Sequence, residues 1–198
     1  DQVVGLASFD TSGGFGCLFN GLPVITNSFL CDRRTGSVTI IEIPGSSNRQ
    51  LGQLVFCRIN STVAQGINDM GQIVGSFLDT NNVRHGFLWQ AGTFTQIDVP
   101  GATSTVANGI NNSSQMVGVF VDASGLSHGF LRDGDTFTRI DVPDATSTEA
   151  NGINNSSQIV GAFAVPEAPP ETGRITRGYV TTPVDSGPLA RFGVPAVQ

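Results

Sequence analysis

The residues of this chain best suited to chemistry are its two histidines, His85 and His128, which hold equivalent places in a repeated segment. Each stands directly before a Gly-Phe-Leu tripeptide. A catalytic histidine needs no copy in the next repeat, and no carboxylate or thiolate stands around either residue at a metal-binding spacing. We predict that both rings are structural, each hydrogen-bonded to a neighbouring strand or turn, and we assign no metal ligand.

Acidic residues recur in the same way. Asp98 and Asp141 each precede a Val-Pro pair, where they are expected to cap the strand end or to pair with arginine. Lining a channel or binding a cation is the alternative. Asp79 and Asp122 each open a turn in which the carboxylate accepts backbone N–H groups. The alternating ligands and distal Glu of a calcium loop are not met.

The sequence contains no recognisable set of residues for acid–base or nucleophilic catalysis. The many serines lack a Gly-x-Ser-x-Gly elbow, and neither a phosphate loop nor a dinucleotide fingerprint occurs. We therefore predict no enzyme, no catalytic residue and no cofactor. One aromatic series at a single repeat position is expected to pack in a core between repeats, and a sugar-stacking row is the alternative. Its members are Phe29, Phe87, Phe130 and Tyr179.

The three cysteines, Cys17, Cys31 and Cys57, all belong to the first and most irregular repeat. Their odd number leaves one thiol free or available to a partner chain. A disulfide between an insertion and the repeat would stabilise the fold by roughly 2–4 kcal/mol. Such a disulfide would be Cys17–Cys31 or Cys31–Cys57, and the sequence does not decide between the two.

Five asparagines satisfy the Asn-x-Ser/Thr pattern that an exported chain can use for glycan attachment. The simpler interpretation of the Asn-Asn-Ser-Ser segments is turn chemistry. Asn60 lies outside the repeated motif and is the stronger candidate. The full set is Asn60, Asn111, Asn112, Asn154 and Asn155.

The elements that carry these residues are set by a ten-residue stretch. Gly109–Gly118 reads Gly-Ile-Asn-Asn-Ser-Ser-Gln-Met-Val-Gly, and related copies occupy Gly152–Gly161 and Gly66–Gly75 at a spacing of 43 residues. His-Gly-Phe-Leu and Ile-Asp-Val-Pro anchors follow. Each repeat holds four short runs rich in β-branched and aromatic residues, bounded by Gly, Asn, Asp and Pro, as is typical of strands.

Four strands in about 40–45 residues match the blade of a β-propeller. We predict one all-β domain over residues 1–198, a four-repeat, propeller-like array of four-stranded antiparallel sheets with an enlarged first repeat. Stacking lets the sheets bury their faces against each other. A β-sandwich or a solenoid of hairpins is the alternative. Counted from Gln-x-Val-Gly, the repeats lie at about 1–71, 72–114, 115–157 and 158–198.

The strand types do not match in number. Gln-x-Val-Gly occurs four times, whereas the Ala-x-Gly-Ile-Asn strand that precedes it occurs three times, so one strand position lacks an occupant. An unpaired sheet edge invites pairing with another chain. The gap is filled within one molecule, filled by a neighbouring molecule, or left open. The predicted subunit contacts are Gln2, Val3, Val4, Val194, Ala196 and Val197.

Composition restricts the partners. The net charge is −6 and all ten basic residues are Arg, which argues against binding to nucleic acid. No apolar run approaches the ~18 residues of a membrane helix, so we expect no membrane insertion. The chain begins at Asp1 without Met, which fits removal of an export leader. The alternative is that the sequence simply starts there.

The anchors Gly66–Gly75, 109–118 and 152–161, with the His-Gly-Phe-Leu copies at 85–88 and 128–131, resemble the bacterial extracellular repeats of the HAF family. The resemblance covers about residues 62–161. It implies export and a propeller-like β fold, and it implies no reaction. The enlarged first repeat and the altered Arg-Gly-Tyr in the fourth depart from the pattern and put a symmetrical ring in doubt.

We therefore predict an extracellular or cell-surface structural protein. Its partners are copies of itself, joined by β-strand complementation into a fibre or higher oligomer. The alternative from another class is a glycan- or ligand-binding extracellular β-propeller.

Overall fold

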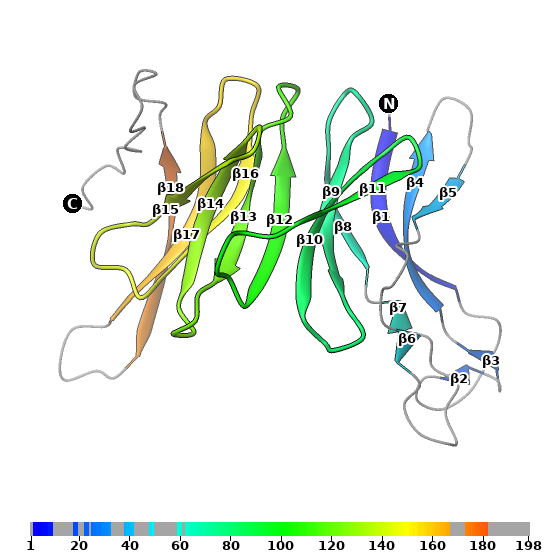
Figure 1. Ribbon diagram of the computed structural model, residues 1–198, viewed down its shortest axis with the longest axis horizontal. Coiled ribbons are helices and arrows are strands. Elements are labelled where there is room, and N and C mark those ends of the chain that lie inside the picture. The colour runs from blue at the N-terminus through cyan, green and yellow to red at the C-terminus, as the bar shows by residue number, and fades with distance from the viewer. Residues whose placement is uncertain are drawn as a thin grey trace.

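All regular structure in the described part of the chain is β-strand. The computed structural model describes residues 2–9, 18–19, 22–23, 25–32, 38–41, 48–49, 59–60, 62–166 and 173–181, with side chains described for Ile41, 62–166 and 173–181. The sheets follow one another in chain order, from the blue N-terminal strands to the orange β18 (Figure 1). The all-β prediction is confirmed.

Three successive antiparallel sheets form the regular part of the molecule. The first has the order β11-β10-β9-β8, the second β12-β13-β14-β15, and the third β16-β17-β18. The bounds of the first are β8 (Val63–Ile67), β9 (Ile73–Leu78), β10 (Arg84–Gln90) and β11 (Thr93–Ile97). Those of the second are β12 (Ser104–Ile110), β13 (Met116–Val121), β14 (Ser127–Asp133) and β15 (Thr136–Ile140). Those of the third are β16 (Ser147–Ile153), β17 (Ile159–Pro166) and β18 (Arg174–Thr181).

The N-terminal sheet precedes these three and is the least regular. It has the order β1-β4-β7-β6, and β5 also pairs with β4. Its strands are β1 (Gln2–Phe9), β4 (Ile25–Asp32), β5 (Val38–Ile41), β6 (Asn48–Arg49) and β7 (Ile59–Asn60). A separate ribbon joins β2 (Leu18–Phe19) and β3 (Leu22–Pro23). The extra short strands match the predicted enlargement of the first repeat.

The two main sequence anchors are cross-strand neighbours. Gly118 of Gln-x-Val-Gly lies opposite Phe130 of His-Gly-Phe-Leu. A Cβ on Gly118 would lie 1.9 Å from the Val106 carbonyl oxygen and 2.7 Å from the Phe130 ring. Gly75 beneath Phe87 and Gly161 beneath Tyr179 repeat this arrangement. Glycine is therefore required here by the close approach of a backbone and an aromatic ring.

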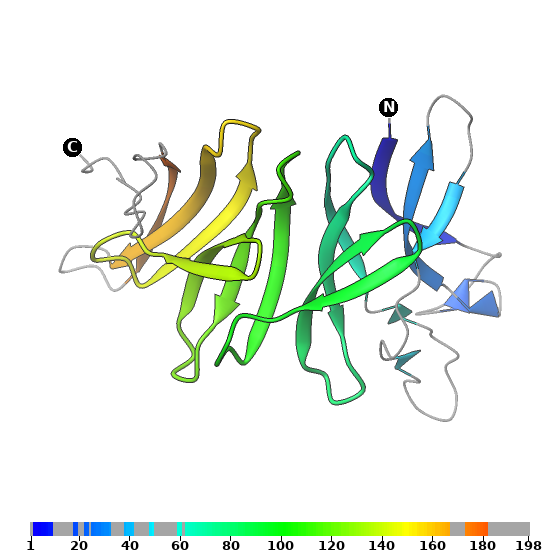
Figure 2. The same cartoon turned by 45° about the horizontal axis from the view of Figure 1, so that its top comes forward.

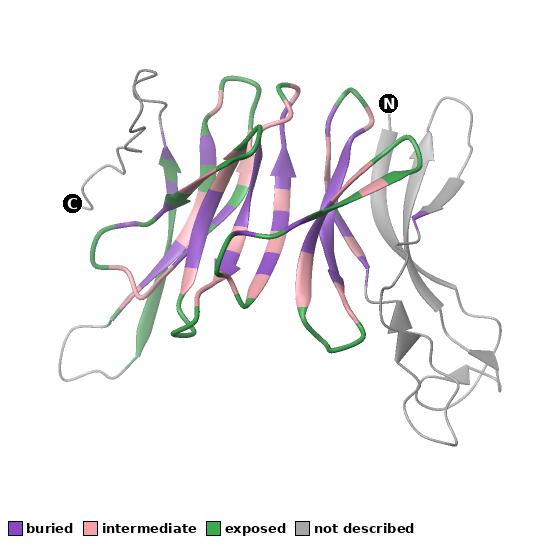
Figure 3. Ribbon diagram, in the orientation of Figure 1, coloured by how far each residue is buried: buried purple, intermediate pink, exposed green. Residues whose placement is uncertain are grey.

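The hydrophobic cores lie between successive sheets. Val74 of β9, for example, belongs to one cluster with Met116, Phe120 and Phe130 of the next sheet. Phe130 is 0% exposed, and burial of such a side chain contributes roughly 1.5–3 kcal/mol. Figure 3 shows buried residues along the strands and exposed residues at the hairpin tips. Sheet stacking is thus the source of the core, as predicted from the repeats.

The row of sheets stays open in the described residues. β1 and β18 lie at opposite ends in both views (Figures 1 and 2). The first two regular sheets have the predicted four strands, and the described part of the third has three. Each of the three regular sheets begins with its Gly-Ile-Asn strand, one strand before the Gln-x-Val-Gly anchor that we used to number the repeats.

Candidate functional site

The outer edge of β1 is the clearest departure from the repeat pattern. β1 and β4 pair in the register of β9 and β10, because Gly5 lies opposite Phe29 as Gly75 lies opposite Phe87. β9, β13 and β17 each have a second partner, the Gly-Ile-Asn strands β8, β12 and β16 respectively. Among the described strands, β1 pairs with β4 alone.

The surroundings of that edge also follow the repeat. β1 contacts β8, just as β9 contacts β12 and β13 contacts β16. The Gly-Ile-Asn strand of the N-terminal sheet would therefore lie next to both β1 and β8. No strand of the described ranges occupies this position. We call it the vacant strand position.

The Gly-Ile-Asn turns are joined from sheet to sheet by a row of side-chain amides. Asn68 Nδ2 donates to the Asn111 carbonyl oxygen at 2.9 Å, and Asn111 Nδ2 donates to the Asn154 carbonyl oxygen at 3.1 Å. We call this row the asparagine ladder. Every bond in it points from one repeat to the next along the chain.

The residue after each of these asparagines adds a second rung. The Asp69 amide N–H donates to Asn112 Oδ1 at 3.0 Å, and the Asn112 amide N–H donates to Asn155 Oδ1 at 2.9 Å. Asn112 Nδ2 also donates to Asp69 Oδ2 at 2.6 Å. Since these groups sit on hairpin tips, the tips of neighbouring sheets are held together by polar contacts rather than by apolar packing.

Each ladder asparagine also shapes its own turn. Asn111 Oδ1 accepts the amide N–H groups of Ser113 and Gln115, both at 3.0 Å, and Ser114 has a positive φ of 61°. Asn favours such turns because its side chain accepts backbone N–H groups nearby. The prediction of turn chemistry for Asn-Asn-Ser-Ser is confirmed. The contact across to the next sheet was not predicted.

Close backbone approach accompanies the ladder. A Cβ on Gly66 would lie 3.2 Å from Gly109 Cα, and a Cβ on Gly109 would lie 3.2 Å from Gly152 Cα. The glycines of successive Gly-Ile-Asn strands therefore face one another at a distance that leaves little room for a side chain.

The predicted glycan acceptors fall into different environments. Asn111 is 2% exposed, and its Nδ2, the atom that carries an N-linked glycan, donates to Gln115 Oε1 as well as to the Asn154 carbonyl. Asn154 and Asn155 are exposed and Asn112 is half-buried. Asn60 lies in β7, and its side chain is outside the described residues. Glycosylation of any of them stays a prediction.

Both histidines bridge two carboxylates. His128 Nδ1 lies 2.8 Å from Asp141 Oδ1, and its Nε2 lies 3.1 Å from Asp122 Oδ2. His85 repeats the pattern, at 2.9 Å from Asp98 and 3.6 Å from Asp79. Both ring nitrogens of His128 and Nδ1 of His85 are therefore hydrogen-bonded, whereas 3.6 Å is too long for a hydrogen bond between His85 Nε2 and Asp79. The predicted hydrogen bonding of both rings to a neighbouring strand or turn is confirmed.

The acidic partners of the histidines have a second role in turns. Asp122 Oδ1 accepts the amide N–H groups of Ser124 and Leu126, as predicted. The hydrogen bond from the Leu126 amide is the main reason why the pKa of Asp122 is lowered. Desolvation acts in the opposite direction and raises it, but its effect is smaller. Asp141 also pairs with Arg139, as predicted. Asp79, His85 and Asp98 have the same spacing in the sequence as Asp122, His128 and Asp141. This equal spacing is a signal from which the contacts between each histidine and its two aspartates could have been predicted.

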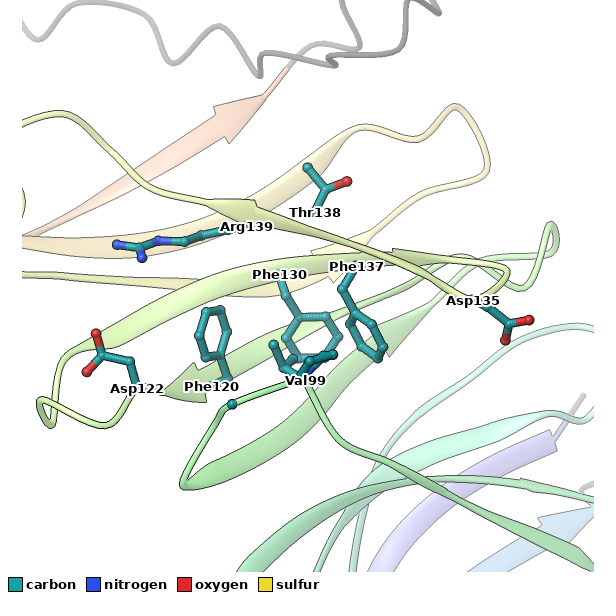
Figure 4. Close-up of a pocket in the computed structure, with 10 residues that line it drawn as sticks. Val99, Phe120, Asp122, Phe130, Asp135, Phe137, Thr138 and Arg139 are labelled. Carbon is teal, nitrogen blue, oxygen red and sulfur yellow. The ribbon is translucent and has the colours of Figure 1, made fainter.

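A shallow groove of about 510 Å³ opens between β15 and the loop that follows β11 (Figure 4). Its apolar floor includes Phe120, Phe130 and Phe137, of which Phe120 and Phe130 are buried. Two charged groups at its rim already have partners. Asp122 accepts a hydrogen bond within its own turn, and Arg139 forms an ion pair with Asp141. The groove therefore offers few free polar groups to orient a ligand.

The remaining predicted residues divide between buried and undescribed positions. Phe87, Phe130 and Tyr179 are at most 6% exposed, which confirms core packing for these three. The side chains of Phe29, Cys31, Gln2, Val3 and Val4 lie outside the described residues, although their strands are described. The positions outside the described residues altogether are Cys17, Cys57, Val194, Ala196 and Val197.

In 62–166 and 173–181, no three or more His, Cys, Asp or Glu residues gather in a way that could hold a metal ion. No helix with the length and hydropathy of a membrane span occurs in the described ranges.

No family model, curated protein or solved structure matches this chain. The resemblance to HAF repeats therefore rests on the sequence anchors alone and stays a prediction.

Proposed function

We propose that this chain is an exported structural protein that assembles with copies of itself by β-strand complementation. In this process, one molecule supplies a strand to the edge of another molecule's sheet. The single observation that carries the proposal is that β1 pairs with β4 alone among the strands that the structure describes, where each equivalent strand has two partners.

The energetic reason is the unpaired backbone of an edge strand. β1 has eight residues, and along an antiparallel strand the N–H and C=O groups point alternately to its two sides. The groups on the outer side bind water until another strand arrives. An added strand replaces that water by main-chain hydrogen bonds.

The mode of contact determines the product of assembly. Strand donation joins two different surfaces, so it is heterologous and forms either a closed ring or a growing fibre. The resemblance to HAF repeats supports an extracellular or cell-surface location for such an assembly. The net charge of −6 keeps nucleic acid an improbable partner in this proposal.

A graft tests the proposal. Residues 104–114 are copied in front of Gln2 in place of Asp1, which recreates the Ser114–Gln115 junction and supplies the missing strand from within the same molecule. We expect the unmodified chain to have a mass in solution well above its 20.7 kDa, and the grafted chain to be monomeric. Size-exclusion chromatography with light scattering measures both.

The matched control carries the same graft with the copied Gly109 replaced by Val and the copied Asn111 by Ala. This segment has the same length and should not fit the vacant strand position, so assembly should persist. An unmodified chain that stays monomeric at every concentration tested would overturn the proposal.

The alternative is a glycan- or ligand-binding protein that uses the groove over Phe137. Titration calorimetry against a panel of neutral and acidic sugars tests it. Saturable binding that Phe137→Ala abolishes would favour this alternative over assembly.

A further inference from the structure

We infer that His128 and its two aspartates form a pH-dependent clasp, which closes completely only when both nitrogens of the histidine ring carry a proton. The clasp ties the turn between β13 and β14 to the loop that follows β15. It consists of contacts inside a single chain and does not depend on assembly. The cluster around His85 has the same plan but only one close contact, so the protein contains its own comparison.

The clasp joins segments that lie apart in the chain. His128 begins the paired part of β14, Asp122 opens the turn before it, and Asp141 follows β15. The ring Nε2 lies 3.1 Å from Asp122 Oδ2, and Nδ1 lies 2.8 Å from Asp141 Oδ1. The residue is 5% exposed, and its ring packs on Phe120 with the two centroids 5.1 Å apart. Water therefore has little room to replace either carboxylate.

Both carboxylates beside the ring are acceptors. The hydrogen bond from the Leu126 amide is the main cause that lowers the pKa of Asp122, so this carboxyl is ionised at neutral pH. Asp141 pairs with the guanidinium of Arg139, which can only donate. An ionised carboxylate has no proton to give. Each ring nitrogen of His128 must therefore supply an N–H for its bond to form.

The number of protons on the ring determines how many contacts of the clasp are closed. A neutral imidazole has one N–H and one lone pair, whereas an imidazolium has two N–H groups. The neutral ring can therefore bind only one aspartate and turns a lone pair toward the other. The protonated ring binds both, and such charge-assisted hydrogen bonds are roughly twice as strong as neutral ones. Loss of the proton opens one contact and weakens the other.

The charges around the ring favour its protonated form. Three strands pack against β14, and of these β13 has no charged residue. β15 has Arg139, which reaches the ring through Asp141, and β16 has Glu149, which together with Asp141 raises the pKa of Tyr179. With Asp122, three carboxylates and one guanidinium thus surround the ring, and a positive ring reduces this excess of negative charge. The other charged residues of β14 stand at its far end with partners of their own: Arg132 and Asp133.

The clasp also borders the groove described above. Asp122 and Arg139 both line that groove, and Figure 4 shows them toward the same end of it. Contacts run without a break from Asp122 through His128 and Asp141 to Arg139. When the clasp opens, the loop after β15 loses a tether at this end of the groove. The shape and the charge of the groove's rim should therefore change with pH.

His85 provides the internal comparison. Its Nδ1 lies 2.9 Å from Asp98, but its Nε2 lies 3.6 Å from Asp79, which is too long for a hydrogen bond. Gln96 Nε2 also lies 3.1 Å from the same Nδ1. A neutral ring with a single N–H satisfies this arrangement, so the His85 cluster should not need the second proton.

Nitrogen NMR of the histidine rings tests the protonation directly. The protein is labelled with ¹⁵N-histidine and measured as a hydrated sediment by magic-angle spinning, so that assembly does not interfere. The chain has two histidines, and a spectrum of His85→Asn assigns the signals. At pH 7.5 we expect two protonated nitrogens in His128 and one in His85. One nitrogen of His128 should lose its proton as the pH rises toward 10.

Two results of the NMR measurement would overturn the inference. One is an unprotonated nitrogen in His128 at pH 7.5, which would show that one contact of the clasp is already open. The other is a His128 ring that stays doubly protonated up to pH 10, which would mean that the clasp does not respond to pH in this range.

Thermal unfolding tests the mechanical consequence. A ring that the fold holds protonated stabilises the folded state at low pH, and this contribution is lost as the pH rises through the titration of the ring. Between pH 7 and pH 10, the melting temperature of the unmodified chain should therefore fall by about 2–4 °C more than that of His128→Asn. His85→Asn is the matched control and should follow the unmodified chain. Parallel profiles for the unmodified chain and His128→Asn would overturn the clasp, and if that variant does not fold, the NMR measurement decides alone.

Discussion

At the scale of single residues, Tyr179 is the misfit of an otherwise uniform series. It holds the position of Phe87 and Phe130, it is 6% exposed, and no hydrogen-bond partner for its hydroxyl exists in the part of the chain that the structure describes. A buried hydroxyl without a partner costs about 1–3 kcal/mol. The ring packs as its phenylalanine counterparts do, so the hydroxyl alone is responsible for the cost.

Tyr179→Phe should therefore raise the free energy of unfolding, by about 1 kcal/mol or more. Urea denaturation at neutral pH measures the change. Phe130→Tyr is the matched control and should lower the same quantity, since it introduces a hydroxyl into an equivalent site. A loss of stability in Tyr179→Phe would mean that the hydroxyl has a partner after all.

Tyr179 also has a signature at alkaline pH. Burial raises the pKa of Tyr179 to about 12, so the folded state favours the neutral phenol. The stability that this gives is complete below pH 10, the pKa in the unfolded chain, and is lost as the pH rises toward 12. Tyr179→Phe should show a smaller loss over that window.

The acidic turn residues act at the other end of the pH scale. The pKa values of Asp79 and Asp122 are both lowered from 3.8, chiefly by backbone N–H groups that bind the ionised carboxylates. A carboxyl with a lowered pKa in the folded state stabilises it above the unfolded pKa, and this contribution disappears as the pH falls through the folded value.

We therefore expect the melting temperature to fall as the pH is lowered below about 4, with Asp122→Asn less sensitive over that range than the unmodified chain. Circular dichroism melts between pH 6 and pH 2 give the comparison. Asp135→Asn is the control, because this exposed residue makes no turn of the same kind. An identical acid profile for Asp122→Asn and the unmodified chain would rule out the turn as the source.

At the scale of the elements, hairpin tips join the sheets. Asn111 combines two bonds inside its turn with one to Gln115 and one to the next sheet, and it is 2% exposed. Asn154 makes the same bonds inside its turn but is exposed, and it donates to no further sheet in the described residues. A comparison of substitutions at Asn111 and Asn154 therefore isolates the contribution of the ladder hydrogen bond to stability.

Asn111→Ala should lower the free energy of unfolding by about 2–4 kcal/mol, because several hydrogen bonds are lost and buried backbone groups remain unpaired. Asn154→Ala should cost about 1–2 kcal/mol, since only its own turn is affected. Denaturant titration measures both. Equal losses would show that the ladder bond adds nothing to the turn.

The elements were largely predictable, whereas the contacts between them were not. Strand positions follow from apolar runs bounded by turn residues, and the pairing of Gly118 with Phe130 explains why both anchors recur. The asparagine ladder joins residues 43 positions apart whose types indicate only a turn, so nothing local reveals it. A tandem repeat has no natural first residue, so numbering from Gln-x-Val-Gly places the repeat bounds one strand after the start of each regular sheet.

The unpaired strand edge could be predicted by counting the two strand types in the sequence. Four Gln-x-Val-Gly strands against three Gly-Ile-Asn strands predicts one unmatched edge, and β1 has that edge in the described residues. The side-chain contacts that join one hairpin tip to the next could not be predicted, because they become visible only when the neighbouring turns are placed side by side.

At the scale of the whole molecule, the two ends of the row differ. Val74 and Val117 are 0% exposed beneath a following sheet, whereas Val160, at the same repeat position in the third sheet, is 47% exposed. At the other end, β1 pairs on one side only among the described strands. An assembly that joins one end to the other covers both features in a single contact, which the grafted chain is designed to prevent.

The one-way direction of the asparagine ladder has an electrical consequence. The side-chain amides of Asn68 and Asn111 both point toward the C-terminal side, each to a carbonyl oxygen, whereas Asn112 Nδ2 in the second rung points back to Asp69 Oδ2. Aligned amides polarise one another and sum to a net dipole. A polymer that prolonged this row would be polar along its length, with a donor tip and an acceptor tip that add subunits at unequal rates.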